Sequence, residues 1–302
     1  MNTKKFLVVV AGPTAVGKTD LAITLANHFN TSIISADARQ FYKEMSIGTA
    51  KPTSAQLAAV PHFFIDTISV PENYTVADYE KDVLQQLDKL FAEKNIAILV
   101  GGSGLFVKAV CNGLDEIPPI QKETRDKWNS LFDEKGLEFL QNELQKHDPV
   151  YFETIDKKNP RRLLRALEVI EETGEPFSSF HTNKNAPRNF TSIKIGLELD
   201  KTELQNRIDL RVDDMIKNGL VDEVKKLFPY KNTSALKTVG YVELFDYLDG
   251  LITLDEATAR IKLHTKQYAK RQMTWFKKDK EIRWFKPSNK KEIIEHIKNQ
   301  IG

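Results

Sequence analysis

Residues 11–19 have the types and the spacing of a phosphate-binding loop. The segment reads AGPTAVGKT, in which Gly12 and Gly17 are followed at once by Lys18 and Thr19. Glycines let backbone N–H groups converge on phosphate oxygens, the lysine supplies a positive charge, and the threonine hydroxyl can coordinate Mg²⁺. Such loops commonly bind ATP or GTP. The motif therefore predicts a bound di- or triphosphate, but it does not identify the reaction.

Two other segments carry side chains that could act on a ligand held by this loop. Asp37 ends the apolar run SIISAD, and Ser103 follows the apolar run AILVGG. The carboxyl ends of parallel strands meet at one edge of a sheet, where ligands bind, so we expect both side chains near the loop. A carboxylate there could accept a proton from a substrate as a general base. The alternative that Asp37 only caps a helix stays open.

Two arginines are spaced to share one face of a helix. Arg207 and Arg211 lie four residues apart in RIDLRVDDM. They could contact the phosphates held by the loop, with Arg211 favoured. They could equally form ion pairs on a solvated face with nearby aspartates, which are Asp209, Asp213 and Asp214. The sequence leaves both readings open.

The elements that must position these residues are those of an α/β core. Four apolar runs, FLVVVAG, SIISAD, AILVGG and SIKIGLELD, are nearly continuous rather than alternating. Continuous runs are typical of strands covered on both faces, and helical patterns lie between most of them. We therefore expect a P-loop core with a mostly parallel sheet flanked by helices. After Asp200 the pattern is helical nearly to the end.

A charged, helical stretch interrupts the predicted core. It lies between the third and fourth runs and is bracketed by the connections DEIPPI and HTNKNAPRN. We predict a helical insertion domain over 115–187 and a catalytic core formed by 1–114 and 188–302. Within the insertion, NPRRLLRALEV resembles a helix start, because proline suits the first helical position. Its arginines could contact RNA or be only a solvated helix start.

Charge is concentrated near the end of the chain. Forty-four Lys and Arg residues nearly balance 42 Asp and Glu residues, giving a net charge of +2. Between Lys262 and Lys291, however, basic residues greatly exceed the two acidic ones, Asp279 and Glu281. Lys262, Lys266 and Lys270 recur at four-residue steps, which predicts a basic stripe on an amphipathic helix that could follow an RNA backbone. Trp275 and Phe276 are expected in the core.

The composition and the N-terminal apolar run indicate the expected location of the protein in the cell. The run Phe6–Val10 is too short for a signal sequence or a membrane span. The single cysteine, Cys111, cannot form an intrachain disulfide or a multi-thiolate metal site. We expect a cytoplasmic protein with no membrane contact.

Together the motifs resemble those of the tRNA dimethylallyltransferase (tRNA isopentenyltransferase) family. The similarity runs over nearly the whole chain, through GPTAVGKT, SADARQFYKEMSIGTAKP, GGSGLFVKAV, DEIPP, NPRRLLRALEV, TVGYVEL and TKQYAKRQMTWF. Small departures occur. The family more often has threonine at Ser103, tyrosine at Phe106, serine at Ala38 and arginine at Lys266.

The resemblance implies an activity and a set of roles. Family members transfer a dimethylallyl group from dimethylallyl diphosphate to the N6 amine of the adenine 3′ to the anticodon in tRNA, so the diphosphate is a leaving group. Mg²⁺ is the implied cofactor, with Thr19 as its ligand. Asp37 is the implied general base and Ser103 orients the amine. The implied diphosphate-binding residues are Gly12, Pro13, Thr14, Ala15, Val16, Gly17, Lys18, Thr19 and Arg211.

The resemblance also implies a binding surface for the tRNA anticodon stem-loop. We expect a monomer, although the sequence does not itself give the oligomeric state. The implied tRNA-binding residues are Asp37, Ala38, Arg39, Gln40, Ser103, Arg125, Arg161, Arg162, Leu163, Leu164, Arg165, Lys270 and Arg271. Other readings are a prenyl transferase acting on free adenine nucleotides, a nucleoside or nucleotide kinase, and a non-catalytic RNA-binding ATPase module. The kinase and the binding module do not require Asp37 beside Ser103.

Overall fold

The computed structural model describes two compact units. The described residues are 4–181 and 186–302. The first unit comprises residues 1–112 and 187–302, and the second comprises residues 113–186. The predicted insertion, 115–187, differs from the second unit by two residues at its start and one at its end. Each unit has a hydrophobic core of its own.

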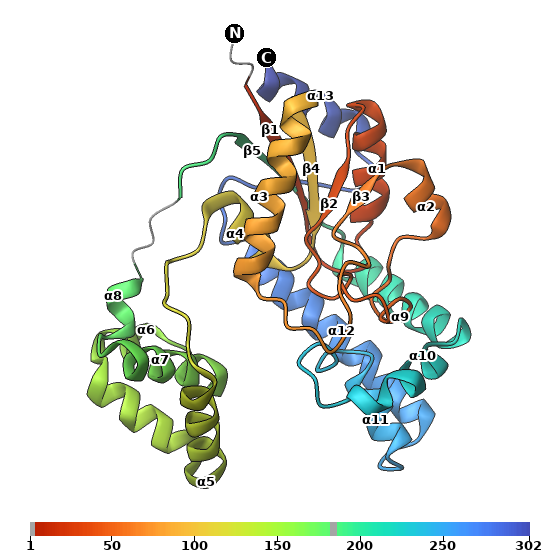
Figure 1. The fold of residues 1–302 in the computed structure, drawn as a ribbon. Coiled ribbons are helices and arrows are strands. Elements are labelled where there is room, and N and C mark those ends of the chain that lie inside the picture. The colour runs from red at the N-terminus through yellow and green to blue at the C-terminus, as the bar shows by residue number, and fades with distance from the viewer. Residues whose placement is uncertain (1–3, 182–185) are drawn as a thin grey trace. The chain divides into compact units, whose positions relative to one another are not determined.

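The first unit is built around a six-stranded sheet with the order β3-β2-β4-β1-β5-β6 (Figure 1). Its strands are β1 (Phe6–Ala11), β2 (Ile33–Ser35), β3 (His62–Phe63), β4 (Ile96–Gly101), β5 (Thr191–Leu197) and β6 (Arg283–Phe285). All pairings between these strands are parallel, which confirms the predicted α/β core. The four apolar runs form β1, β2, β4 and β5. The short edge strand β6 corrects the expectation of a helical pattern from Asp200 nearly to the end.

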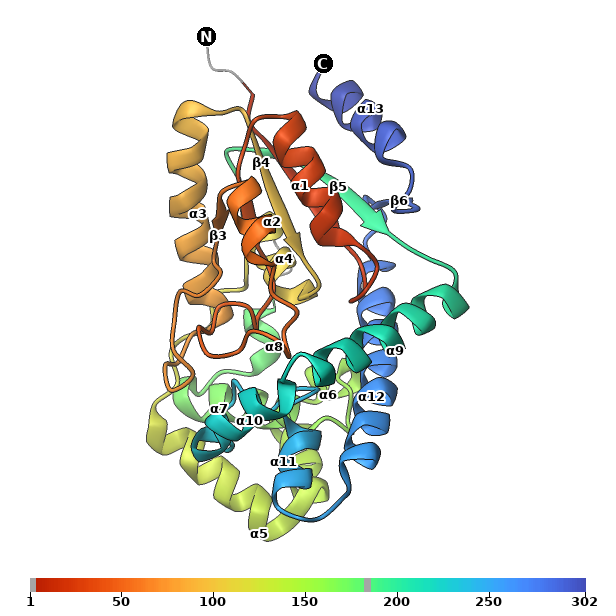
Figure 2. The ribbon, with the colours of Figure 1, turned by 90° about the vertical axis from the view of Figure 1, so that its right-hand side faces the viewer.

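Helices cover both faces of this sheet (Figure 2). They are α1 (Lys18–His28), α2 (Ser54–Ala59), α3 (Val76–Glu93), α4 (Gly104–Asn112) and α13 (Lys290–Ile301). On one face, Val8 and Val10 share a core cluster with residues of α1 and α13. On the other, Leu7 and Val9 share a cluster with residues of α3 and α4. Alternate residues of β1 are thus buried on opposite faces, which explains its continuous apolar run.

Between β5 and β6 the chain forms a group of helices. They are α9 (Lys201–Lys217), α10 (Leu220–Leu227), the 3₁₀ helix η1 (Phe228–Tyr230), α11 (Val242–Leu248) and α12 (Leu254–Phe276). A third core cluster contains Leu220, Tyr241 and Ile261 from this region together with Tyr42 and Met45. Because Tyr42 and Met45 lie between β2 and α2, this cluster attaches the C-terminal helices to the segment that follows Asp37.

The second unit is helical where the structure describes it. Its helices are α5 (Lys122–His147), α6 (Pro149–Thr154), α7 (Pro160–Thr173) and α8 (Phe177–Phe180). At Gly136, α5 is kinked, with φ of +75°. Residues from α5, α6, α7 and α8 form one core cluster, which includes Trp128, Leu144, Phe152 and Leu167. This unit therefore has an interior independent of the sheet.

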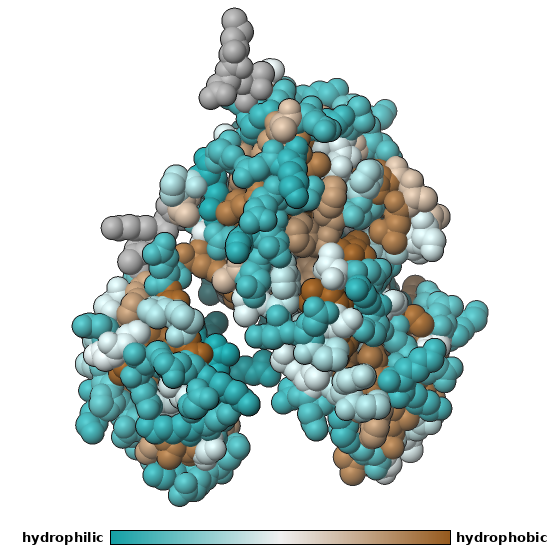
Figure 3. All heavy atoms as spheres, in the orientation of Figure 1, coloured by the Kyte–Doolittle hydropathy of each residue, from teal (hydrophilic) through white to brown (hydrophobic). Residues whose placement is uncertain are grey.

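Polar residues cover much of the surface. Figure 3 shows hydrophilic side chains over most of the visible face, with hydrophobic ones in smaller groups. Among the described residues, no helix combines the length and the apolarity needed to cross a membrane.

Candidate active site

The phosphate-binding loop connects β1 to α1, and its geometry requires two glycines. Gly12 has φ of +146°, and a Cβ there would lie 2.7 Å from the carbonyl oxygen of Leu197. Gly17 has φ of +101° and is the N-cap of α1. Such positive φ values are unfavourable for residues with a side chain. Because Gly17 has no side chain to cap the helix, the first N–H groups of α1 are left to bind an anion held in the loop.

The Lys18 side chain is held against the same loop. Its Nζ donates a hydrogen bond to the carbonyl oxygen of Pro13 at 2.7 Å. Burial lowers the pKa of Lys18 to about 8, while Asp37 raises it and Arg211 lowers it further. A bound phosphate would favour the ammonium form, since an opposite charge stabilises the ionised state. The geometry suits Lys18 to the predicted role of binding phosphate.

Two cavities meet above this loop. The first, of about 290 Å³, is lined by residues that include Thr14, Lys18, Thr19, Asp37 and Arg211. The second, of about 230 Å³, is lined by Asp37, Ser103 and apolar side chains that include Val212, Met215, Val239 and Ile261. The residues that line both are Thr14, Asp37, Thr49, Ala50, Arg211 and Tyr268. A ligand in one cavity and a ligand in the other would therefore meet beside Asp37.

Asp37 and Ser103 lie after the paired strands β2 and β4 and both line the second cavity. The Ser103 hydroxyl accepts a hydrogen bond from the backbone N–H of Ala38 at 3.0 Å. Oδ1 of Asp37 accepts one from the backbone N–H of Arg39 at 3.0 Å. The chain after Asp37 forms turns, and the next helix begins at Ser54, so Asp37 does not cap a helix. The structure thus brings the two predicted catalytic side chains together.

The two arginines of α9 differ in their surroundings. Arg211 Nη1 donates a hydrogen bond to Thr14 Oγ1 at 3.3 Å, and burial lowers the Arg211 pKa while Asp20 raises it. Arg207 instead pairs with Glu203 at 2.8 Å. Only Arg211 of the two lines the cavities, as the sequence favoured.

Two of the three neighbouring aspartates, Asp209 and Asp213, pair with α12 rather than with these arginines. Lys266 lies 2.7 Å from Asp209, and Lys262 lies 2.6 Å from Asp213. Two lysines of the predicted basic stripe therefore form ion pairs with α9. This corrects the expectation that the whole stripe is free to follow an RNA backbone.

Gln272 of α12 is a site residue that the sequence did not reveal. Its Oε1 accepts a hydrogen bond from the backbone N–H of Thr14 at 2.8 Å, and its Nε2 donates one to the carbonyl oxygen of Gly102 at 2.9 Å. A Cβ at Gly102 would lie 2.2 Å from Nε2, so only glycine leaves room for this contact. Gln272 therefore ties the phosphate-binding loop to the end of β4.

Tyr268 is the second site residue that was missed. Its ring lines both cavities, and burial together with the Asp37 charge raises the pKa of its hydroxyl to about 12. Arg39, a hydrogen bond with Ser103 and Arg271 act in the opposite direction. The Tyr268 hydroxyl is therefore un-ionised near neutral pH and can donate or accept a hydrogen bond beside Asp37.

A helical spacing connects these two residues. The α12 residues that line the cavities are Ile261, Thr265, Tyr268 and Gln272. Their steps of four, three and four residues define one face of a helix. In the sequence, the signal that could have revealed these two residues was the presence of polar residues on the face of this helix that points away from the lysine stripe.

The other residues of the first unit that were predicted to bind tRNA lie either at the cavities or on the exposed surface of α12. Ala38 and Arg39 line the second cavity, and Gln40 lines the first. Lys270 and Arg271 are exposed on α12, and the Arg271 guanidinium lies 5.8 Å from the centre of the Tyr268 ring. Arg271 is thus the member of this pair that lies close to the cavities.

Trp275 differs from its sequence expectation. Phe276 is buried, as predicted, but the Trp275 side chain is 40% exposed. Its ring lies against Gly104, where a Cβ would be 2.2 Å from the indole. Trp275 is therefore a surface residue of α12 that packs against α4, and not a member of the interior.

The arginines of the second unit lie at its surface. Asn159 is the N-cap and Pro160 the first residue of α7, which confirms the predicted helix start. Arg161 and Arg162 are exposed beside it, and Arg125 is exposed on α5. Arg165 lies 3.8 Å from Glu168, whose pKa is raised by burial against the opposing effect of Arg165 and Arg125.

Leu163 and Leu164 correct the sequence prediction of tRNA contact. Leu163 is fully buried and Leu164 is 8% exposed, and both belong to the core of the second unit. The amphipathic pattern of α7 explains this, since the leucines follow the apolar face while the arginines follow the polar one. Their side chains stabilise the unit and are not placed to touch a ligand.

The residues around the loop fit a magnesium ion held mainly by phosphate. The described part of the chain contains no group of three His, Cys, Asp or Glu placed to hold a metal. The first cavity does present the Thr19 hydroxyl and the carboxylates of Asp20 and Asp37. Mg²⁺ prefers oxygen ligands and commonly binds through one or two protein groups together with substrate phosphates. This donor set suits that mode and not a site made of protein ligands alone.

Replacing Gln272 by Leu is expected to destabilise the fold by about 1–3 kcal/mol, because it leaves the buried Gly102 carbonyl unsatisfied and removes the partner of the half-buried Thr14 N–H. It should also weaken binding of inorganic diphosphate, since the loop loses a contact that fixes it. Thermal unfolding and calorimetric titration measure the two effects. Unchanged stability and affinity would show that the bridge is not needed.

Comparison with known proteins assigns the family. Residues 40–279 match the model of the family described as IPP transferase. The tRNA dimethylallyltransferase of Christiangramia forsetii is 49% identical over 298 residues, covering 98% of this chain and 99% of that protein. The tRNA dimethylallyltransferase of Flavobacterium johnsoniae is 45% identical, with 97% of each chain covered.

Solved structures agree. The full-length tRNA isopentenylpyrophosphate transferase from Bacillus halodurans matches with a TM-score of 0.74 and 34% identity, covering 99% of this chain and 97% of that one. A eukaryotic dimethylallyltransferase acting on tRNA matches with a TM-score of 0.77 and 27% identity, covering 90% of this chain and 70% of that one. A match of this extent favours a transferase over a kinase or a binding module. The chain belongs to the IPP transferase family, together with the tRNA dimethylallyltransferases.

Proposed function

We propose that this enzyme transfers a dimethylallyl group from dimethylallyl diphosphate to the N6 amine of the adenine 3′ to the anticodon in tRNA, releasing diphosphate. The relatives described above are named tRNA dimethylallyltransferases, which supports transfer of a dimethylallyl group to tRNA. The observation that carries the proposal is the position of Asp37. It lies where a cavity over the phosphate-binding loop meets a second cavity that contains Ser103.

The first cavity suits the diphosphate of the donor. Departure of diphosphate from an allylic carbon builds negative charge on the leaving oxygens. Lys18, Arg211 and the N–H groups at the start of α1 are placed to stabilise that charge. Mg²⁺, when bound, would supply further charge stabilisation through the phosphate oxygens. The loop therefore acts on the leaving group.

Asp37 and Ser103 suit the acceptor amine. An exocyclic adenine amine is a weak nucleophile, because its lone pair is delocalised into the ring, so it must lose a proton as the carbon–nitrogen bond forms. The Asp37 carboxylate takes this proton as general base, and the Ser103 hydroxyl orients the amine. The un-ionised Tyr268 hydroxyl, which faces the same junction, is a second group that can orient the reacting atoms.

The acceptor base must leave its stack to reach this junction. Turning a loop nucleotide outward costs roughly a few kcal/mol, and this cost is smaller than the cost of turning out a paired base. Contacts to phosphates offset this energy. The exposed arginines of α7 and α5 and the exposed pair Lys270 and Arg271 are the proposed phosphate contacts.

A double substitution tests the RNA contact of the second unit. Arg161→Ala with Arg162→Ala is expected to weaken tRNA binding and to make the slope of log affinity against log salt shallower by about 1 to 2, because two phosphate contacts are lost. Lys127→Ala is the matched control, since Lys127 is already paired with Glu171 at 2.6 Å. Filter binding over a salt series measures both. A slope equal to that of the unchanged protein would remove these arginines from the interface.

The activity itself is tested with unmodified tRNA, dimethylallyl diphosphate, Mg²⁺ and the purified protein. Mass spectrometry of the digested nucleosides should show one five-carbon unit on a single adenosine, located next to the anticodon. Modification of free adenine nucleotides but not of tRNA would point to the related nucleotide prenyl transferases instead.

A further inference from the structure

One segment of the first unit forms a wall of both cavities. We call residues 46–51 the wall segment. Gly48 lines the second cavity, Lys51 lines the first, and Thr49 and Ala50 line both. Any movement of this segment would change the shape of the space beside Asp37.

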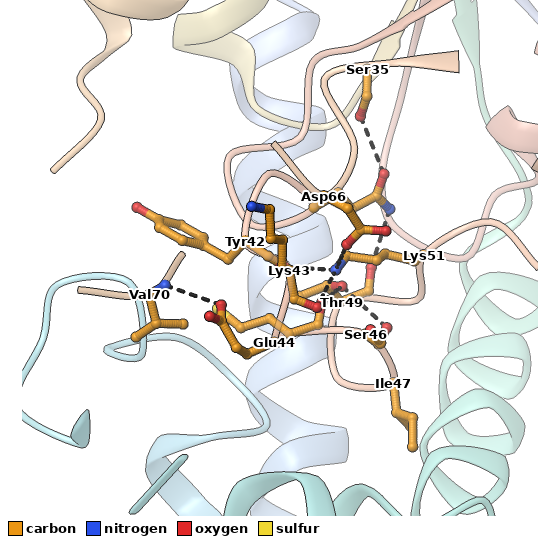
Figure 4. A network of polar contacts seen from close by, with 12 residues as sticks. Ser35, Tyr42, Lys43, Glu44, Ser46, Ile47, Thr49, Lys51, Asp66 and Val70 are labelled. Atoms are coloured by element: carbon orange, nitrogen blue, oxygen red, sulfur yellow. Dashed lines mark hydrogen bonds and ion pairs between the residues drawn. The ribbon is translucent and has the colours of Figure 1, made fainter. Parts of the chain in front are cut away.

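The wall segment is held from within by a polar network (Figure 4). Lys51 Nζ donates to the carbonyl oxygen of Tyr42 at 2.6 Å and pairs with Asp66. The Thr49 hydroxyl donates to the carbonyl oxygen of Met45 at 2.7 Å. These contacts fold the segment back on residues 42–45.

Gln40 connects the wall segment to the segment that carries Asp37. Its Nε2 lies 3.2 Å from the carbonyl oxygen of Thr49 and 3.3 Å from that of Ala50, and donates to both. Its Oε1 accepts a hydrogen bond from the Ser35 hydroxyl at 3.2 Å. Both polar atoms of the Gln40 side chain are thus used in hydrogen bonds that hold the cavity wall in place.

The backbone of the wall segment is strained. Ala50 has φ of +49°, in the left-handed region that a residue with a side chain occupies at an energetic disadvantage. Such a conformation persists only where the surroundings fix it. The segment therefore needs restraints from outside itself.

Glu223 of α10 supplies the main restraint from outside. Its Oε2 accepts hydrogen bonds from the backbone N–H groups of Ser46 at 3.0 Å and Ile47 at 2.7 Å, and its Oε1 accepts one from Gly48 at 3.1 Å. The Tyr241 hydroxyl donates to the same Oε1 at 2.7 Å. Hydrogen bonds to an ionised carboxylate are stronger than those between neutral groups.

Tyr241 also restrains the wall segment sterically. Its side chain is fully buried, and a Cβ at Gly48 would lie 2.6 Å from its ring. Burial and the Glu223 charge raise the pKa of the Tyr241 hydroxyl, which therefore stays un-ionised and keeps donating. Glu223 thus holds three consecutive residues of the wall segment by hydrogen bonds, and the Tyr241 ring packs against the last of them, Gly48.

We propose that Glu223 is a positioning residue for the donor: by fixing residues 46–48 it also holds the adjoining residues 49–51, which line the cavity in which the diphosphate binds. The identity of the donor rests on the proposed function, but the effect on diphosphate binding does not. A residue that served stability alone would change the fraction of folded protein without changing the affinity of the folded molecules.

The test is Glu223→Gln, in which an amide N–H₂ would face backbone N–H donors. Inorganic diphosphate is expected to bind about 10- to 100-fold more weakly, and the KM for dimethylallyl diphosphate should rise more than kcat falls. Asp222→Asn is the matched control, because Asp222 is exposed and lies 4.0 Å from its nearest cation, Lys225. It should behave like the unchanged protein.

Tyr241→Phe is the second variant. It removes one hydrogen bond to Glu223 but keeps the ring beside Gly48, so a smaller shift in the same direction is expected.

If Glu223→Gln lowers the melting temperature while diphosphate affinity and KM stay unchanged, the positioning role is wrong. If Glu223→Gln does not fold, unchanged diphosphate affinity in Tyr241→Phe overturns it. If the variants bind diphosphate more weakly but the wild-type protein transfers no prenyl group, the proposed function is wrong and the positioning role stands.

Discussion

Asp37→Asn is expected to lower kcat by about 10²- to 10⁴-fold, the range that a general base contributes. The asparagine keeps the size of the side chain and the oxygen that accepts the Arg39 N–H, but it cannot take a proton from the adenine amine. Affinity for tRNA should stay close to that of the unchanged protein. Single-turnover kinetics with saturating tRNA and donor measure the chemical step directly.

A control is needed for the effect of Asp37 on its neighbour. Asp37 raises the Lys18 pKa, so its loss also favours the uncharged form of Lys18. Donor affinity is therefore measured in the same variant over a series of pH values below 8, because the Lys18 pKa of about 8 in the wild-type protein falls when the Asp37 charge is removed. A kcat within a few fold of the original would remove Asp37 from proton transfer, whereas loss of donor binding alone would assign it to the donor side.

Lys18→Met is the second large effect, with donor affinity and turnover expected to fall by about 10²- to 10³-fold, as for removal of a group that stabilises developing negative charge. Methionine retains the apolar length of the side chain without the ammonium. Calorimetric titration with inorganic diphosphate and steady-state kinetics measure the two quantities. Lys217→Met is the control, because Lys217 is exposed at the end of α9 and does not line the cavities.

The lowered Lys18 pKa adds a pH dependence to this prediction. Below pH 8 the free protein already carries the ammonium, so diphosphate binds without a change in this proton. Above pH 8 Lys18 is neutral in the free protein and must take up a proton on binding, so affinity should fall by up to about tenfold per pH unit. The fall should be absent in Lys18→Met. An unchanged slope in that variant would assign the pH dependence to another group.

The parts of the site that the sequence revealed are those fixed by local geometry. The glycine spacing of the loop and the strand ends before Asp37 and Ser103 follow from the parallel sheet, so these residues could be placed without coordinates. The edge strands β3 and β6 have two and three residues and, unlike the equally short β2, were not indicated by an apolar run that ends in a candidate site residue. They form because β2 and β5 offer free edges.

The contacts that the sequence did not reveal join residues far apart in the chain. Gln272 bonds to Thr14 across 258 positions, and Glu223 bonds to Ser46 across 177. No local pattern encodes such a pairing. The buried Leu163 shows a different limit, because a motif match carries a whole segment into the site although only its polar face lies at the surface.

The stoichiometry of diphosphate release tests the central claim most directly. The claim is that the loop holds the leaving group of a prenyl donor and not the phosphates of a nucleotide. Inorganic diphosphate and modified adenosine are measured in one reaction that contains tRNA, Mg²⁺ and dimethylallyl diphosphate but no ATP. Our account predicts one diphosphate for each modified adenosine. Modification that proceeds only when ATP is added and consumed would contradict it.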